Sequence, residues 1–123
     1  SEFSAFINSA ISAMLYFGVF VDKIRFLIGQ ETPSKFSVLG NATLEGIDLF
    51  INRKNRILDY NCIANAVIYH EIAHRVDLER RRKLASLQRK SIDEILKTKM
   101  IQYFIVNGST MSMLRISYCH QKF

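Results

Sequence analysis

The sequence predicts one small α+β domain, with a helix first, a group of short strands next and two further helices after them. Three observations lead to this prediction. Residues 3–21 carry no charge and place apolar side chains at helical spacing. Residues 23–58 contain short alternating runs separated by Gly, Pro and Asn. From residue 61 to the low 80s, neither Gly nor Pro interrupts a helical pattern.

The length and composition fit a single folded unit. A chain of 123 residues with 49% hydrophobic residues can enclose one core but not two, so we treat residues 1–123 as one domain. The two cysteines, Cys62 and Cys119, are too few for a disulfide framework, which favours reduced thiols and a cytoplasmic location. The net charge of +6 is compatible with acidic partners but identifies none.

The first helix is expected within residues 3–21. Its apolar residues follow one face, while serine, asparagine and tyrosine side chains follow another. A membrane-spanning helix is more often apolar all round, so we favour a core helix with one face in solvent. Membrane contact through this stretch is the less favoured alternative.

Three to four strands are expected next, in a small and mostly antiparallel sheet. Gly40 and Asn41 are expected to separate the second strand from the third, and Gly46 to form a bulge within the third. The expected strands are residues 23–28, 35–39, 43–51 and 56–58.

The long helix after the strands carries the pattern His-Glu-x-x-His at positions 70 to 74. Residues four apart lie one above the other on a helix, so His70 and His74 can offer both imidazoles to a single Zn²⁺. Glu71 lies beside the first ligand, where it can hold and deprotonate a zinc-bound water. The chain has only three histidines, which makes this spacing a specific signal. A surface helix with two unrelated histidines is the alternative.

With this motif the chain resembles the zincin metallopeptidases, whose active-site helix carries His-Glu-x-x-His. In length and order of elements it is similar to the minigluzincins, minimal forms that can be latent. The resemblance implies bound zinc and hydrolysis of a peptide or protein substrate, with Glu71 as the general base. It also implies that the substrate lies along an edge strand, which we assign to residues 43–51. A tyrosine near the metal could stabilise the oxyanion, and Tyr69 and Tyr103 are the two candidates.

Catalytic zinc needs a third protein ligand. Glu94 follows His74 at a spacing that resembles the gluzincin arrangement, in which a Glu on the next helix completes the site. We favour Glu94, although Ser91-x-x-Glu94 also reads as a capping box that would close the start of its own helix. Asp77, one turn beyond His74, and His120 near the end of the chain are the other candidates.

The last helix is expected to begin near Ser91 and to end at Asn107 and Gly108. Residues 112–120 then alternate like a strand that ends in two zinc donors, Cys119 and His120. If either donor occupied the open zinc position, the enzyme would be latent.

Two other functions are compatible with the sequence. A non-catalytic or regulatory zinc-binding module is favoured by the small size of the chain and by Thr98, where gluzincins often carry an Asp. A nucleic-acid-binding domain would use the basic residues within 75–90, but a charged run such as 79–83 is usually a solvated helix face. We therefore favour the zinc metallopeptidase, in an active or a latent form.

Overall fold

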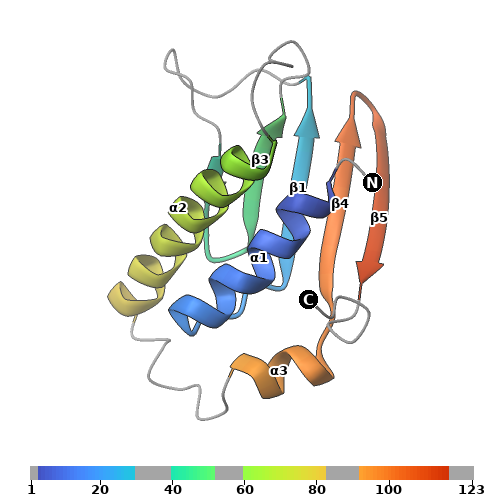
Figure 1. Ribbon diagram of the computed structural model, residues 1–123. Helices are drawn as coiled ribbons and strands as arrows, with labels where there is room; N and C mark the ends of the chain where they lie inside the picture. The colour runs from blue at the N-terminus through green and yellow to red at the C-terminus, as the bar shows by residue number, and fades with distance from the viewer. Residues whose placement is uncertain (1–2, 30–39, 52–59, 83–91, 117–123) are drawn as a thin grey trace.

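The computed structural model describes residues 3–29, 40–51, 60–82 and 92–116 (Figure 1). It confirms a small α+β fold. The elements in chain order are α1 (Ser4–Phe17), β1 (Lys23–Ile28), β2 (Gly40–Ala42), β3 (Ile47–Ile51), α2 (Tyr60–Arg81), α3 (Ile92–Thr98), β4 (Ile101–Asn107) and β5 (Thr110–Ile116).

The sheet has five strands in the order β2-β3-β1-β4-β5. The central strand β1 runs parallel to both β3 and β4, whereas β2 with β3 and β4 with β5 are antiparallel pairs. The sheet is therefore mixed and larger than the mostly antiparallel sheet of three to four strands that we expected. β1 and β4 can run parallel because the long connection through α2 and α3 returns the chain to the end of the sheet at which β1 begins. The strands expected at 35–39 and 56–58 lie outside the described residues.

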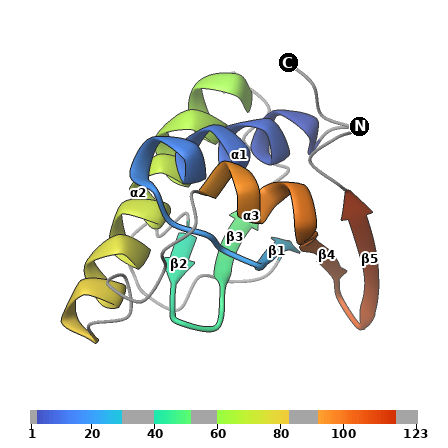
Figure 2. The same ribbon diagram turned by 90° about the horizontal axis from the view of Figure 1, so that it is seen from below.

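The three helices of the described residues lie on one side of the sheet (Figure 2). The side of the sheet that faces them supplies Phe26, which is fully buried and contacts the rings of Phe3, Phe6 and Tyr103. From α1, Ala10 and Met14 are among the fully buried residues, which confirms α1 as a core helix. Within the described residues no helix combines the length and the apolar character needed to cross a membrane.

The prediction of one helix from Ser91 to Asn107 is wrong for its second half. α3 ends at Thr98, and residues 101–107 form β4, whose residues 102–107 pair with β1. A short apolar run fits helical and strand spacing equally well, and pairing with a buried strand decides between them. Gly108, at φ 62°, starts a two-residue turn between β4 and β5 and does not end a helix.

The strand expected at 43–51 is also shorter than predicted. β3 covers only residues 47–51, while Gly40 and Asn41, expected as a break, belong with Ala42 to the edge strand β2. Gly46 lies in the turn between β2 and β3. A side chain does not fit there, because a Cβ would be 2.6 Å from the carbonyl oxygen of Lys23. β3 is an inner strand of the sheet, so the edge strand that lies beside α2 is β2.

Candidate functional site

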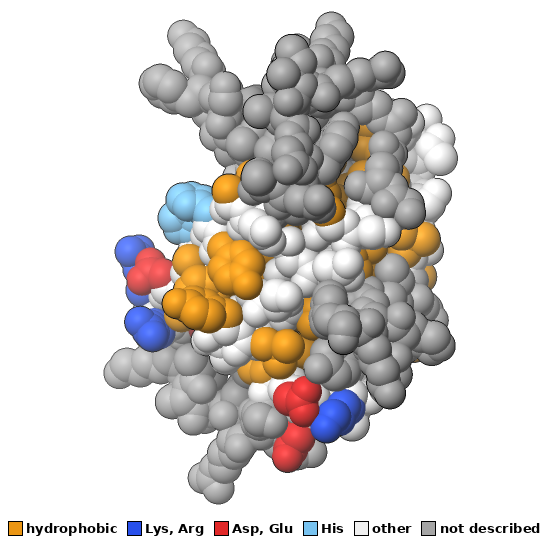
Figure 3. Space-filling view, in the orientation of Figure 1, with side chains coloured by type: hydrophobic (Ala, Val, Ile, Leu, Met, Phe, Trp, Pro, Cys, Tyr) orange, Lys and Arg blue, Asp and Glu red, His pale blue; other side chains and the backbone are white. Residues whose placement is uncertain are grey.

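Helix α2 places its apolar stripe inward and its two histidines outward. Ile68 and Ile72 are fully buried, and Val76 is partly buried against the same core, as the four-residue spacing predicts. His70 and His74 are both exposed. Figure 3 shows histidine side chains at the surface, next to acidic and basic side chains.

The two imidazoles converge. Their Nε2 atoms are 2.9 Å apart, and the ring centroids are 4.5 Å apart with the planes at 88°. Two nitrogen ligands around a tetrahedral zinc, each about 2.0–2.1 Å from the ion, are separated by roughly 3.3 Å. A small rotation of either ring therefore gives the spacing that zinc requires.

Glu71 is buried, although it lies between two exposed histidines in sequence. Its exposed fraction is 4%, and no group among the described residues forms a hydrogen bond with its Oε2 atom. Burial raises the pKa of the carboxyl group, and electrostatic interaction with the neighbouring imidazoles of His70 and His74 opposes that rise. A buried oxygen without a partner is costly, which favours a bound ligand or water beside it.

The donor atoms of His70, Glu71 and His74 all lie within 4.8 Å of one another. Within the described part of the chain, this is the one cluster of at least three His, Cys, Asp or Glu residues that could hold a metal ion. Comparisons with known protein families, with curated proteins and with solved structures found no match for this chain. The likeness to the zincins therefore rests on this cluster and on its spacing.

The cluster lines a hollow of about 440 Å³ between α2 and the edge strand β2. Gly40 in β2 lies directly against the cluster, since a Cβ at this position would lie 2.7 to 2.9 Å from Cγ, Oε2 and Cδ of Glu71. The walls are formed from β2 by Gly40, Asn41 and Ala42, and from α2 by His70, Glu71, His74, Asp77, Leu78 and Arg81.

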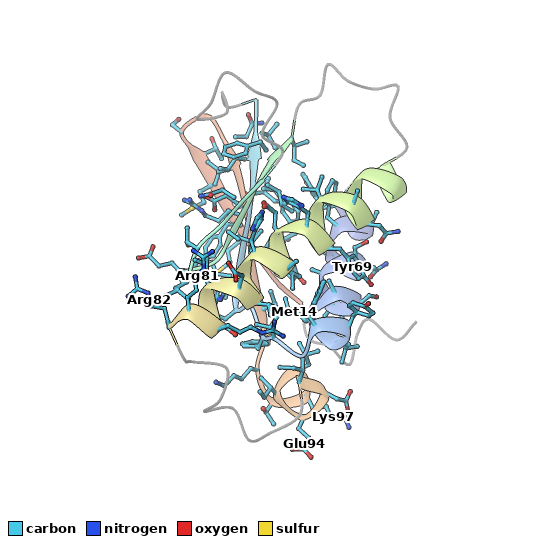
Figure 4. All side chains as sticks on the ribbon, turned by 90° about the vertical axis from the view of Figure 1, so that its left-hand side faces the viewer. Met14, Tyr69, Arg81, Arg82, Glu94 and Lys97 are labelled. Atoms are coloured by element: carbon cyan, nitrogen blue, oxygen red, sulfur yellow. The ribbon has the colours of Figure 1, made fainter. Side chains whose placement is uncertain are left out.

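The predicted third ligands are placed differently. Asp77 lines the hollow and forms an ion pair with Arg81, at 3.0 Å between Oδ2 and Nε. Glu94 is exposed on α3 and does not line the hollow, and neither Asp77 nor Glu94 is part of the donor cluster. In Figure 4 its side chain points away from α2. The capping alternative depends on Ser91 and the remaining candidate is His120; both lie outside the described residues, as does Cys119.

Neither predicted tyrosine lines the hollow. Tyr69 packs against Tyr16 and Phe17 of α1, with ring centroids 6.0 and 6.1 Å away. Figure 4 shows Tyr69 and Arg81 on opposite sides of α2. Tyr103 is fully buried beneath the helices and stacks on Phe26, and this burial raises the pKa of its hydroxyl. The described walls of the hollow therefore offer no tyrosine to an oxyanion.

Sequence reasoning missed three residues next to the site. Gly40 was expected to break a strand, Glu79 to lie on a solvated helix face, and Arg75 was considered only among the basic residues of a nucleic-acid-binding alternative. In the structure both charged side chains are buried, with exposed fractions of 8% and 6%. The spacing of four residues from Glu71 to Arg75 and on to Glu79 was the available signal, because it places all three on one helix face.

Proposed function

We propose that this chain is a zinc-dependent metallopeptidase, with His70 and His74 as zinc ligands and Glu71 as the general base. The observation that carries the proposal is the buried Glu71 carboxyl group, whose Oε2 has no hydrogen-bond partner among the described residues and which lies beside two converging imidazoles. A structural zinc site needs ligands but no buried carboxyl group that is left without a partner.

The roles of the residues follow from their positions. Zinc bound by the two imidazoles would polarise the scissile carbonyl and acidify the attacking water. Glu71 would accept a proton from that water and donate it to the leaving amine. Its burial supports this role, because a raised pKa makes the carboxylate a better proton acceptor.

The edge strand supplies a place for an extended substrate. β2 pairs with β3 on one side and borders the hollow on the other. An exposed strand edge can pair with a peptide through main-chain hydrogen bonds. A peptide aligned with β2 would pass the His70, Glu71 and His74 cluster, which supports a peptide or protein substrate.

The test is removal and return of the metal. We expect the purified protein to cleave a library of fluorogenic peptides, to lose this activity when a chelator strips the zinc, and to regain it when one equivalent of Zn²⁺ is added. Activity that survives complete removal of zinc would contradict the proposal.

A non-catalytic zinc module is the second candidate, and one observation favours it. The donor cluster within the described residues contains no protein ligand beyond His70, Glu71 and His74. This candidate predicts zinc binding without hydrolysis of any peptide. The proposal of nucleic-acid binding has less support, since Arg75 is buried against Glu79 and Arg81 is paired with Asp77.

A further inference from the structure

Three charged side chains on one face of helix α2 are buried. Glu71, Arg75 and Glu79 are the buried charged side chains among the described residues, and they are spaced four apart. They therefore share the helix face that is turned towards β2 and the turn after it. A buried charge is costly unless it is paired and hydrogen-bonded. The partners of Arg75 therefore indicate the role of these three side chains.

Arg75 joins two parts of the chain that are far apart in sequence. Its Nε donates a hydrogen bond to Oε1 of Glu79 at 3.0 Å, one turn further along the same helix. Its Nη1 donates to the carbonyl oxygen of Thr43 at 2.9 Å, immediately after β2. The guanidinium group can make both bonds at once because its donors form a rigid planar fork.

The carbonyl that Arg75 reaches lies in a fixed turn. The backbone N–H of Thr43 donates to the carbonyl oxygen of Gly46 at 2.9 Å, and the N–H of Glu45 donates to the Thr43 hydroxyl at 3.2 Å. Gly46 packs so closely on β1 that a Cβ would lie 2.6 Å from the carbonyl oxygen of Lys23. The turn therefore gives Arg75 a firm anchor on the sheet.

β2 is consequently held against α2 at both ends. At its start Gly40 contacts the carboxyl group of Glu71, and just beyond its end Thr43 is bound by Arg75. We propose that Arg75, oriented by Glu79, is a positioning residue that sets the distance between β2 and the Glu71 carboxyl group. The inference rests on the proposed function only for its catalytic consequence, because the link between helix and strand exists without it.

The substitution Arg75→Lys tests the role directly. A lysine ammonium can pair with Glu79, but it lacks the planar fork that reaches Thr43 at the same time. Below the melting transition of each variant we expect kcat for peptide hydrolysis to fall at least about tenfold, since small displacements of a catalytic group have large effects on rate. Zinc affinity, measured by chelator competition, should stay unchanged because both imidazoles are retained.

Arg25→Lys is the matched control. Arg25 also donates two hydrogen bonds to a partner, both at 2.7 Å to the carboxylate of Asp48, but this pair lies away from the hollow. The control should keep the kcat of the unaltered protein. An unchanged kcat in Arg75→Lys, or an equal loss in both variants, would overturn the positioning role.

A separate readout distinguishes failure of this inference from failure of the proposed function. If the unaltered protein binds zinc but cleaves no peptide, the peptidase proposal fails. Hydrogen exchange at the amides of Asn41 and Ala42 then decides the inference alone. Faster exchange in Arg75→Lys than in Arg25→Lys supports the link between α2 and β2, and equal exchange in the two variants contradicts it.

Discussion

The carboxyl group of Glu71 occupies the space that a side chain at position 40 would need. A Cβ at Gly40 would lie 2.8 Å from Oε2, closer than real Cβ atoms approach other atoms. A glycine here lets the strand backbone come against the proposed general base. The close approach of Gly40 adds to the burial of Glu71, and burial is the main cause of its raised pKa. One missing side chain thus affects both the position and the chemistry of the carboxyl group.

The substitution Gly40→Ala tests this contact. We expect it to lower the free energy of unfolding by about 1–3 kcal/mol, because the added methyl group overpacks the site. In a Glu71→Ala background the loss should be smaller, since the methyl group then has room. Urea denaturation of the two single variants and the double variant measures the difference, with Asn41→Ala as a neighbouring control. An equal cost of Gly40→Ala in both backgrounds would contradict the contact.

Among the elements, α1, β1 and α2 could be predicted from the sequence because each has a long or regular pattern. The bounds of α2 and its inward stripe of Ile68 and Ile72 follow from helical spacing without Gly or Pro. The same spacing predicts that His70 and His74 come together, and the structure confirms it. Local pattern is sufficient wherever the residues that interact are close in sequence.

β2 and β4 could not be predicted from their own residues, because each is defined as a strand by its pairing with another strand. β2 has only three residues, one of them Gly40, and is recognisable as a strand only through its pairing with β3. β4 contains an apolar run that suits a helix as well, and its parallel pairing with β1 spans most of the chain. The sequence therefore could not predict which strand forms this edge of the sheet, or that this strand forms one wall of the hollow.

The two candidates for the third zinc ligand lie on different helices, Asp77 on α2 and Glu94 on α3. Asp77 lines the hollow and Glu94 does not, so we expect Asp77→Asn to weaken zinc affinity about tenfold or more, whether its carboxylate acts directly or through a water. Glu94→Gln should leave the affinity unchanged. Chelator competition measures both.

The control for Asp77 is Arg81→Gln, which removes the same ion pair and keeps the carboxylate. A large loss of zinc affinity in Glu94→Gln, together with none in Asp77→Asn, would support the gluzincin arrangement that the sequence favours.

At the scale of the whole molecule, the candidate site lies at one edge of a two-layer fold (Figures 1 and 2). The core formed by α1, α2 and the sheet holds the inner face of α2, and the hollow opens where α2 meets the short edge strand. Both histidine ligands lie on one helix of this fold. Zinc bound there would add its binding free energy to the stability of the folded state.

Zinc should therefore raise the melting temperature of the protein. At a free concentration about 100 times the dissociation constant, a ligand specific for the folded state stabilises it by about 2.7 kcal/mol, which for a chain of 123 residues corresponds to roughly 10 °C. Differential scanning calorimetry with and without Zn²⁺ measures the shift. The double variant His70→Ala with His74→Ala should show none, and an equal shift in that variant would place the zinc elsewhere.

The central claim is that one cluster on α2 both binds zinc and carries the general base. The most direct test is Glu71→Gln, with zinc content measured by inductively coupled plasma mass spectrometry and hydrolysis measured on the same preparation. We predict one zinc per chain in both proteins, and a loss of hydrolysis of at least about a hundredfold in the variant, because the amide cannot accept a proton from water. A variant that keeps full activity, or an unaltered protein that contains no zinc and still cleaves peptides, would contradict the account.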